Sequence, residues 1–255
     1  MKIEYLATSV NIQFEFFNIQ FRFIRAACLT DVKYHMEYGL LFLIALLVCI
    51  LWFMHRRKRS VLKAERAAMF NDCTDLFETH RITQDDIYYP VLEGGYRGHD
   101  FRLEPIADHI AFRTIPSLWL LVTLRKKTPY EGIFDFLVRQ RNVEFYSPSS
   151  KLRIDIDIPE GWPQFAVLRT NNPERMPPQE RLAPHIAFFD DPKAKELLVT
   201  PKGVRVVYQA RQADRSHYML LRQVVFEDIN LSPNLVRELM DRCTAVYRSL
   251  IEKQH

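Results

Sequence analysis

The chain has 255 residues, 48% of them hydrophobic and 26% charged, which is ordinary for a globular protein of one large or two small domains. Its net charge of +4 arises within residues 1–59, which hold eight Lys or Arg and four acids. The rest of the chain holds 27 of the 35 basic residues and 27 of the 31 acidic residues, so its net charge is zero. A domain that binds nucleic acid through phosphates shows a basic surplus, and we therefore predict no nucleic-acid partner.

The first 35 residues alternate apolar and polar side chains in the stretch "NIQFEFFNIQFRFIRAACL". This is strand periodicity, yet no turn residues or partner strand accompany it. We expect residues 1–35 to be a tail outside the folded core and translation to begin at Met36. The alternative is that the tail is a strand that binds a partner on the far side of a membrane.

An uncharged run from Gly39 to Met54 follows, and a basic cluster comes directly after it. The cluster consists of His55, Arg56, Arg57, Lys58 and Arg59. A helix over residues 36–55 would be about 30 Å long at ~1.5 Å per residue, which matches the thickness of a bilayer core. A buried core helix would not tolerate the consecutive cations. The sequence therefore predicts a transmembrane helix over residues 36–55, with the basic cluster at the membrane interface.

The orientation of this span follows from its flanks. Six Lys or Arg lie within reach of its C-terminal end and three within reach of its N-terminal end, and the richer side stays in the cytoplasm. No small-residue cleavage site follows, so the span is an uncleaved anchor. We predict a single-pass protein of the bacterial inner membrane that contacts lipid through one helix and keeps its C-terminal domain in the cytoplasm.

Residues 56–82 predict a juxtamembrane helix. They are free of Gly and Pro, and Leu62, Met69 and Leu76 recur every seven residues. Fewer than three heptads is weak support for a coiled coil, so we expect this stripe to pack onto its own domain.

Residues 83–255 predict a cytoplasmic α+β domain with a mostly antiparallel sheet of about six to eight strands. Ser232 and Pro233 start a C-terminal amphipathic helix, whose apolar stripe should cover one face of the sheet. A helix is also expected to begin at Pro184. The expected strands and hairpins are 87–105, 117–125, 132–138, 152–159, 164–170, 195–210 and 217–228.

A glycine-rich hairpin around residues 94–98 supplies weak candidates for chemistry. Tyr96, Arg97, His99 and Asp100 would form its exposed tip, and Asp108 and His109 are a second acid–base candidate. No HExxH, GxSxG or P-loop pattern is present, and the four cysteines lack CxxC spacing. We therefore predict no catalytic, metal-binding or cofactor-binding residue and no cofactor.

The pattern "YRGHDFRLEP…IPSLWLLVTL…HIAFFDDPKAKELLVTPKGVRVV…SHYMLLRQVVFE" resembles an uncharacterised group of bacterial, particularly alphaproteobacterial, single-pass membrane proteins. The resemblance covers residues 36–255 and implies an anchored cytoplasmic α+β domain, without an activity. We expect a membrane-tethered interaction or scaffolding module with a protein partner. The alternative is a membrane-anchored, hydrolase-like enzyme with a site near the hairpin at residues 94–109.

Overall fold

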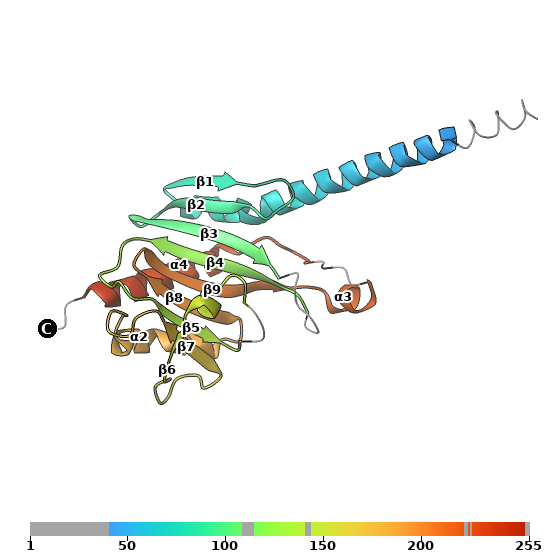
Figure 1. Cartoon of the computed structure of the whole chain (residues 1–255). Coiled ribbons are helices and arrows are strands. Elements are labelled where there is room, and N and C mark those ends of the chain that lie inside the picture. The colour runs from blue at the N-terminus through green and yellow to red at the C-terminus, as the bar shows by residue number, and fades with distance from the viewer. Residues whose placement is uncertain (1–40, 109–114, 141–143, 222–223, 225, 253–255) are drawn as a thin grey trace, which may run out of the picture. The chain divides into compact units, whose positions relative to one another are not determined.

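The structure is a computed structural model that describes residues 41–108, 115–140, 144–221, 224 and 226–252 (Figure 1). The chain divides into two units, Met1–Ser60 and Val61–His255. The tail expected over residues 1–35 lies outside the described residues, as does the start of the expected span at Met36.

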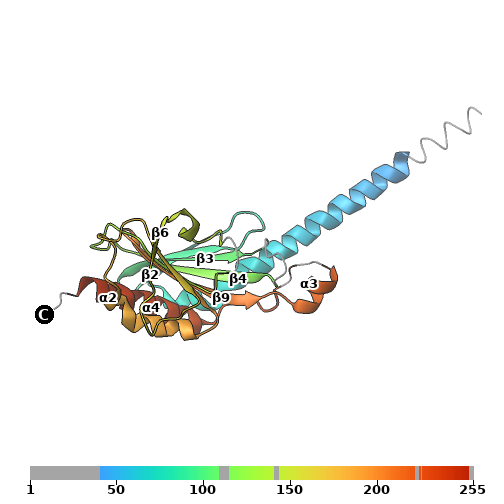
Figure 2. The ribbon, with the colours of Figure 1, turned by 60° about the horizontal axis from the view of Figure 1, so that its bottom comes forward.

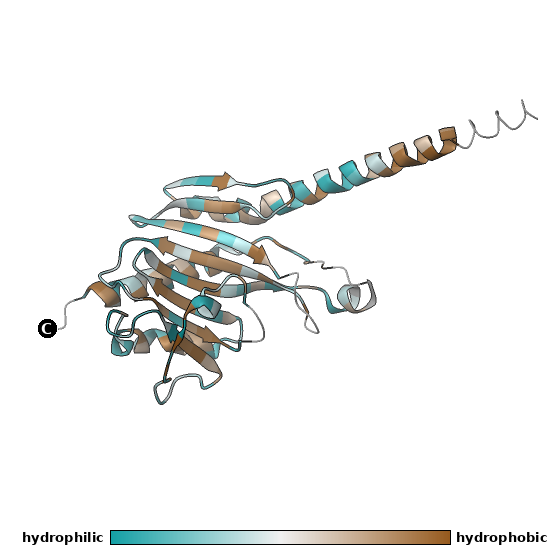
Figure 3. Cartoon of the chain, in the orientation of Figure 1, coloured by the Kyte–Doolittle hydropathy of each residue, from teal (hydrophilic) through white to brown (hydrophobic). Residues whose placement is uncertain are grey.

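Residues 41–60 of the first unit are helical, and all of their side chains are exposed. Figure 3 shows the apolar colouring of this helix giving way to hydrophilic colouring along its length, where the basic cluster follows the apolar run. Within the part of the chain that the structure describes, no helix combines the length and the apolar character needed to cross a membrane.

The second unit opens with residues 61–67, which are helical. A 3-10 helix, η1 (Ala68–Leu76), follows, and β1 (Thr79–Thr83) begins three residues later. The expectation of one helix to residue 82 is therefore wrong at its end. Phe77 already has an extended backbone, and Glu78 N–H donates to Gly95 O, so pairing with the next strand replaces the helix.

Among its described residues, the second unit is built on one sheet of nine strands, in the order β1-β2-β3-β4-β9-β8-β5-β7-β6, and every neighbouring pair is antiparallel. This confirms the α+β class and the antiparallel sheet, with more strands than expected. The remaining strands are β2 (Val91–Tyr96), β3 (His99–Ala107), β4 (Ser117–Arg125), β5 (Phe134–Val138), β6 (Ile154–Ile156), β7 (Ala166–Thr170), β8 (Ala194–Thr200) and β9 (Gly203–Gln212).

Two tight hairpins set the register of this sheet. Between β2 and β3, the turn residues Arg97 and Gly98 both have positive φ, 49° and 73°, as a two-residue hairpin turn requires. Between β8 and β9, Gly203 has a φ of 155°, and a Cβ there would lie only 2.0 Å from Leu124 O. Both hairpins were predicted, but Gly94 and Gly95 lie within β2 and not in the turn.

One face of the sheet is covered by helices (Figure 2). The long helix α4 (Pro233–Ile251) packs there with α2 (Gln179–Ile186) and η1, and the apolar residues between them and the sheet form the main core. The predicted apolar stripe of α4 is confirmed. Its buried members are Val236, Leu239, Met240, Cys243, Val246, Tyr247 and Leu250.

Three local expectations are wrong. Residues 215–221 form a helix, α3 (Arg215–Leu221), where a strand was expected from residue 217, because a short apolar run does not distinguish helix from strand. Pro184 lies inside α2, which begins at Gln179. Tyr96 is only 5% exposed, because alternate residues of β2 point into the core. The short 3-10 helices η2 (Ser149–Lys151) and η3 (Ala187–Asp190) complete the described elements.

Candidate functional site

The face of the sheet opposite α4, called here the open face, carries a row of directly opposed residues that crosses all nine strands. Opposed residues of antiparallel strands project on the same side, so the row is continuous. We call it the charge ladder because seven of its nine members are charged. Its members are Arg81, Glu93, Arg102, Thr123, Arg205, Leu198, Asp135, Arg169 and Asp155.

The part of the open face over β1 to β4 is joined by ion pairs. Glu93 accepts from Arg102 at 2.8 Å and pairs with Arg125 at 2.9 Å, while Arg102 also pairs with Glu104 at 3.1 Å. The hydrogen bond from Arg102 lowers the pKa of Glu93. This surface therefore presents paired charges of both signs.

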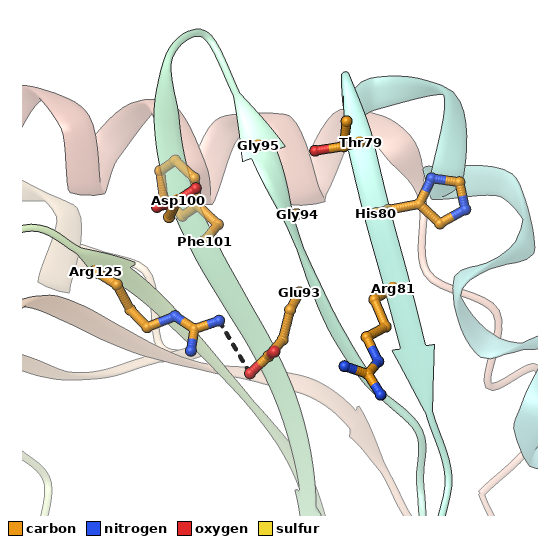
Figure 4. Close-up of a pocket in the computed structure, with 9 residues that line it drawn as sticks. All are labelled: Thr79, His80, Arg81, Glu93, Gly94, Gly95, Asp100, Phe101 and Arg125. Carbon is orange, nitrogen blue, oxygen red and sulfur yellow. Dashed lines mark ion pairs between the residues drawn. The ribbon is translucent and has the colours of Figure 1, made fainter.

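Two hollows lie in this region. The larger, of about 610 Å³, is shown in Figure 4, where a dashed line marks the ion pair between two of its lining residues, Glu93 and Arg125. Its lining residues are Thr79, His80, Arg81, Glu93, Gly94, Gly95, Asp100, Phe101 and Arg125. The second, of about 460 Å³, is bordered by Arg102, Glu104, Tyr88 and Tyr89 among others.

The part of the open face over β9, β8 and β5 is covered by residues 144–151, called here the strap. Tyr146 of the strap packs beside Trp119 with ring centroids 5.6 Å apart and joins a small cluster with Leu121 and Val207. Its backbone oxygen accepts a hydrogen bond from Arg205 at 3.1 Å. The charge ladder therefore passes beneath the strap at its centre and is open towards β1.

Beneath the strap lies a buried acidic pair. Asp135 and Glu196 are both 0% exposed; Arg205 pairs with Glu196 at 3.1 Å, and the Ser147 hydroxyl donates to Asp135 at 3.5 Å. Burial, reinforced by the charge of Glu196, raises the pKa of Asp135 to about 8. Burial also raises the pKa of Glu196, against the opposing effect of Arg205. These effects favour a protonated Asp135 at neutral pH.

The hairpin candidates from the sequence are not brought together. Arg97 pairs with Asp241 on α4 at 2.8 Å. His99 lies on the helix-covered side, with its ring against Tyr247 and its Nδ1 3.5 Å from Lys126 Nζ. Asp100, the next residue of β3, lines the larger hollow on the other side. Burial and the Lys126 charge lower the pKa of His99. Because His99 and Asp100 lie on opposite sides of β3, they do not form an acid–base pair.

The second candidate pair is described only in part. Asp108 N–H donates to Ser117 O at 2.8 Å, which continues the pairing of β3 with β4, and His109 lies outside the described residues. Within the described ranges, no group of three or more His, Cys, Asp or Glu is placed to hold a metal ion.

The basic cluster at residues 55–59 is helical and exposed in the first unit. Arg56 lies over the ring of Trp52, one helical turn earlier, at 4.6 Å from its centroid. The two residues therefore share one side of the helix, which is the pairing of an aromatic ring with a long cation that membrane interfaces favour.

The sequence reasoning missed the buried acids. Asp135 stands alone in the apolar run "IFDFLV", and Glu196 stands at the start of the apolar run in "KELLVT". An acid within a continuous apolar strand is a usable signal, since such an acid is buried unless the strand exposes one face. Their pairing joins residues on two strands distant in sequence, and no local pattern contains it.

Comparison with known proteins gives no family. No protein-family model matches the chain, and no curated protein matches it significantly. Among solved structures, the chain aligns with the crystal structure of the mycobacterial trehalose monomycolate transport factor A, TtfA, at 10% sequence identity and a TM-score of 0.39. The alignment covers 76% of this chain and 98% of that one. A likeness of this extent supports no argument about function.

Proposed function

We propose that the protein is a membrane-tethered interaction or scaffolding module whose domain after residue 60 binds a protein partner in the cytoplasm. The observation that carries this proposal is the open face between β1 and β4. It presents ion-paired charges around two shallow hollows, and the described candidates for catalysis point away from one another. A surface of fixed, mixed charge suits recognition of a protein of complementary charge pattern.

The tether in this proposal is the apolar run that ends at Met54. In the first unit its side chains are exposed, from 47% at Ile50 to 71% at Phe42, and apolar surface of this extent needs a partner. Lipid is the partner that agrees with the basic cluster, whose long side chains can reach the headgroups. Placement in a bacterial inner membrane, with the larger unit in the cytoplasm, is part of the same proposal.

Site-specific photocrosslinking of the full chain in living cells tests the partner surface. A photoreactive residue at Asp100, in the larger hollow, should give a discrete adduct with another protein in the membrane fraction. The matched control is Arg237, which is exposed on α4, on the other side of the sheet. Adducts of equal yield at both positions, or none at Asp100, would refute the open face as the binding surface.

The hydrolase alternative has no supporting observation among the described residues. His99 and Asp100 lie on opposite sides of β3, whereas acid–base catalysis needs its groups within about 3 Å of one another or of one substrate atom.

A further inference from the structure

The two edges of the sheet carry opposite ends of the charge ladder. At one edge is β1, whose five residues are all exposed and whose central residue is Arg81. At the other edge is β6, whose central residue is Asp155. Among the described residues, no strand pairs with the outer side of β1 or of β6. Unpaired edges offer backbone groups to another strand.

The charges at these edges differ in how far they are neutralised. Arg81 makes no hydrogen bond or ion pair with any described residue, although it faces Glu93 across the strands. Asp155 accepts from Arg169 at 2.7 Å but remains 72% exposed. One edge thus ends in a cation and the other in an accessible acid, on the same face of the sheet.

Both edges also expose an isoleucine on the helix-covered side. Ile82 is 36% exposed and Ile154 is 38% exposed. These residues neighbour Arg81 and Asp155 in sequence, so they project to the opposite side of their strands. Each edge therefore has a charge on one side and an apolar side chain on the other.

We infer that β1 of one copy pairs with β6 of a second copy, so that the charge ladder and the sheet continue from one molecule into the next. The occupant of each edge is another copy of this chain. The association uses the edges of the sheet and does not depend on the partner proposed for the open face.

The directions of the strands define how such a pair forms. Every neighbouring pair in the sheet is antiparallel, so β1 in the first place and β6 in the ninth run in the same direction. A second copy with its open face on the same side therefore brings β1 alongside β6 in parallel. With Arg81 beside Asp155, Ile82 comes beside Ile156 and near Ile154.

Like edges are disfavoured by the same charges. Two β1 strands related by a two-fold axis and centred on their middle residue would bring Arg81 against Arg81, and two β6 strands would bring Asp155 against Asp155. Like charges directly opposed destabilise strand pairs. The contact is thus head-to-tail, which leads to rows of copies unless the rotation closes a ring.

Crosslinking between copies of the full chain tests the inference. With p-benzoylphenylalanine at Ile82, irradiation of cells should give a crosslinked dimer, whose yield is compared between variants on a denaturing gel. In the chain with unaltered β6, the label should join the tryptic peptide that contains residues 154–169. Arg81→Glu should reduce this adduct severalfold. Asp155→Lys combined with Asp157→Lys, which also prevents pairing after a two-residue slip, should reduce it likewise, and Arg81→Lys should retain it.

Co-expression of the two charge-reversed variants tests whether β1 of one copy meets β6 of the other. One chain carries Arg81→Glu, and the other carries Asp155→Lys with Asp157→Lys. Cells that express both chains should recover the adduct, because the altered β1 of the first then meets the oppositely charged β6 of the second. Thermal unfolding of each variant checks that it is folded. The inference is overturned if the label joins β1 of the other copy, joins a different protein or joins nothing, or if charge reversal leaves the adduct unchanged.

Discussion

At the residue scale, Asp135 and Glu196 are the buried acids beneath the strap. Both are fully buried, and burial beside the charge of Glu196 favours the protonated form of Asp135. The pKa of Asp135 lies near 8 in the folded protein and near 3.8 when unperturbed. Between these values the folded state keeps a proton that the unfolded chain has released.

The stability of the protein should therefore fall as pH rises. The stabilisation that this proton gives the folded state is complete below about pH 4 and is lost as the pH rises towards 8. Over this range the free energy of unfolding should fall by up to about 1.4 kcal/mol per pH unit. Asp135→Asn, which cannot ionise, should flatten this dependence between pH 5 and 8 in urea unfolding of the full chain. Asp157→Asn, at an exposed acid, is the control. Equal slopes for wild type and Asp135→Asn would contradict a protonated Asp135 in the folded state.

The turn between β2 and β3 gives a second test at this scale. Gly98 has a φ of 73°, and a Cβ added there would meet nothing within 4 Å. Gly98→Ala should lower the free energy of unfolding by about 1 kcal/mol through backbone strain alone. Gly95→Ala, in the same hairpin but without positive φ, should cost less. The two effects are compared by thermal unfolding, and a larger loss at Gly95 would count against the turn geometry.

At the element scale, α4 is the helix that closes the core. It packs on β4 and β9 in the middle of the sheet and against α2, so the strands on either side depend on its apolar stripe. Local sequence is sufficient to predict this helix, because Pro233 at its first turn and a 3.6-residue period are both local signals.

Leu239→Asp tests whether that stripe is core. Leu239 is 0% exposed, and an unpaired charge there should cost about 4 kcal/mol or more. Glu238→Gln is the matched control on the exposed side, where loss of the pair with Arg242 at 2.7 Å should cost about 0.3–0.5 kcal/mol. Wild-type stability of Leu239→Asp in chemical unfolding would show that α4 does not close the core.

At the scale of the whole molecule, the proposed tether gives the clearest prediction. An alkaline phosphatase fused after His255 should be inactive and a fluorescent protein fused there should fluoresce, because the phosphatase matures only outside the cytoplasm. Neutralising Arg56, Arg57, Lys58 and Arg59 together should raise phosphatase activity by weakening the orientation signal. An active phosphatase on the unaltered chain would place the domain on the other side of the membrane.

Sequence alone determined those features whose cause is local. The apolar run at 117–125 predicted a central strand, and β4 lies between β3 and β9. The turn residues around Gly98 and Gly203 predicted two hairpins, because positive φ restricts which residues a tight turn accepts. Where a signal is ambiguous over seven residues, as at Arg215–Leu221, the prediction was wrong.

Only the tertiary structure decided which residues meet. The charge ladder takes one residue from each of the nine strands described, and its order follows the sheet and not the chain. Asp135 and Glu196 meet because β5 and β8 are neighbours, and His99 and Asp100 separate because adjacent residues of a strand face opposite sides. Periodicity reports which side of an element is apolar, whereas contacts between charges depend on strand order and register, which packing of the whole domain selects.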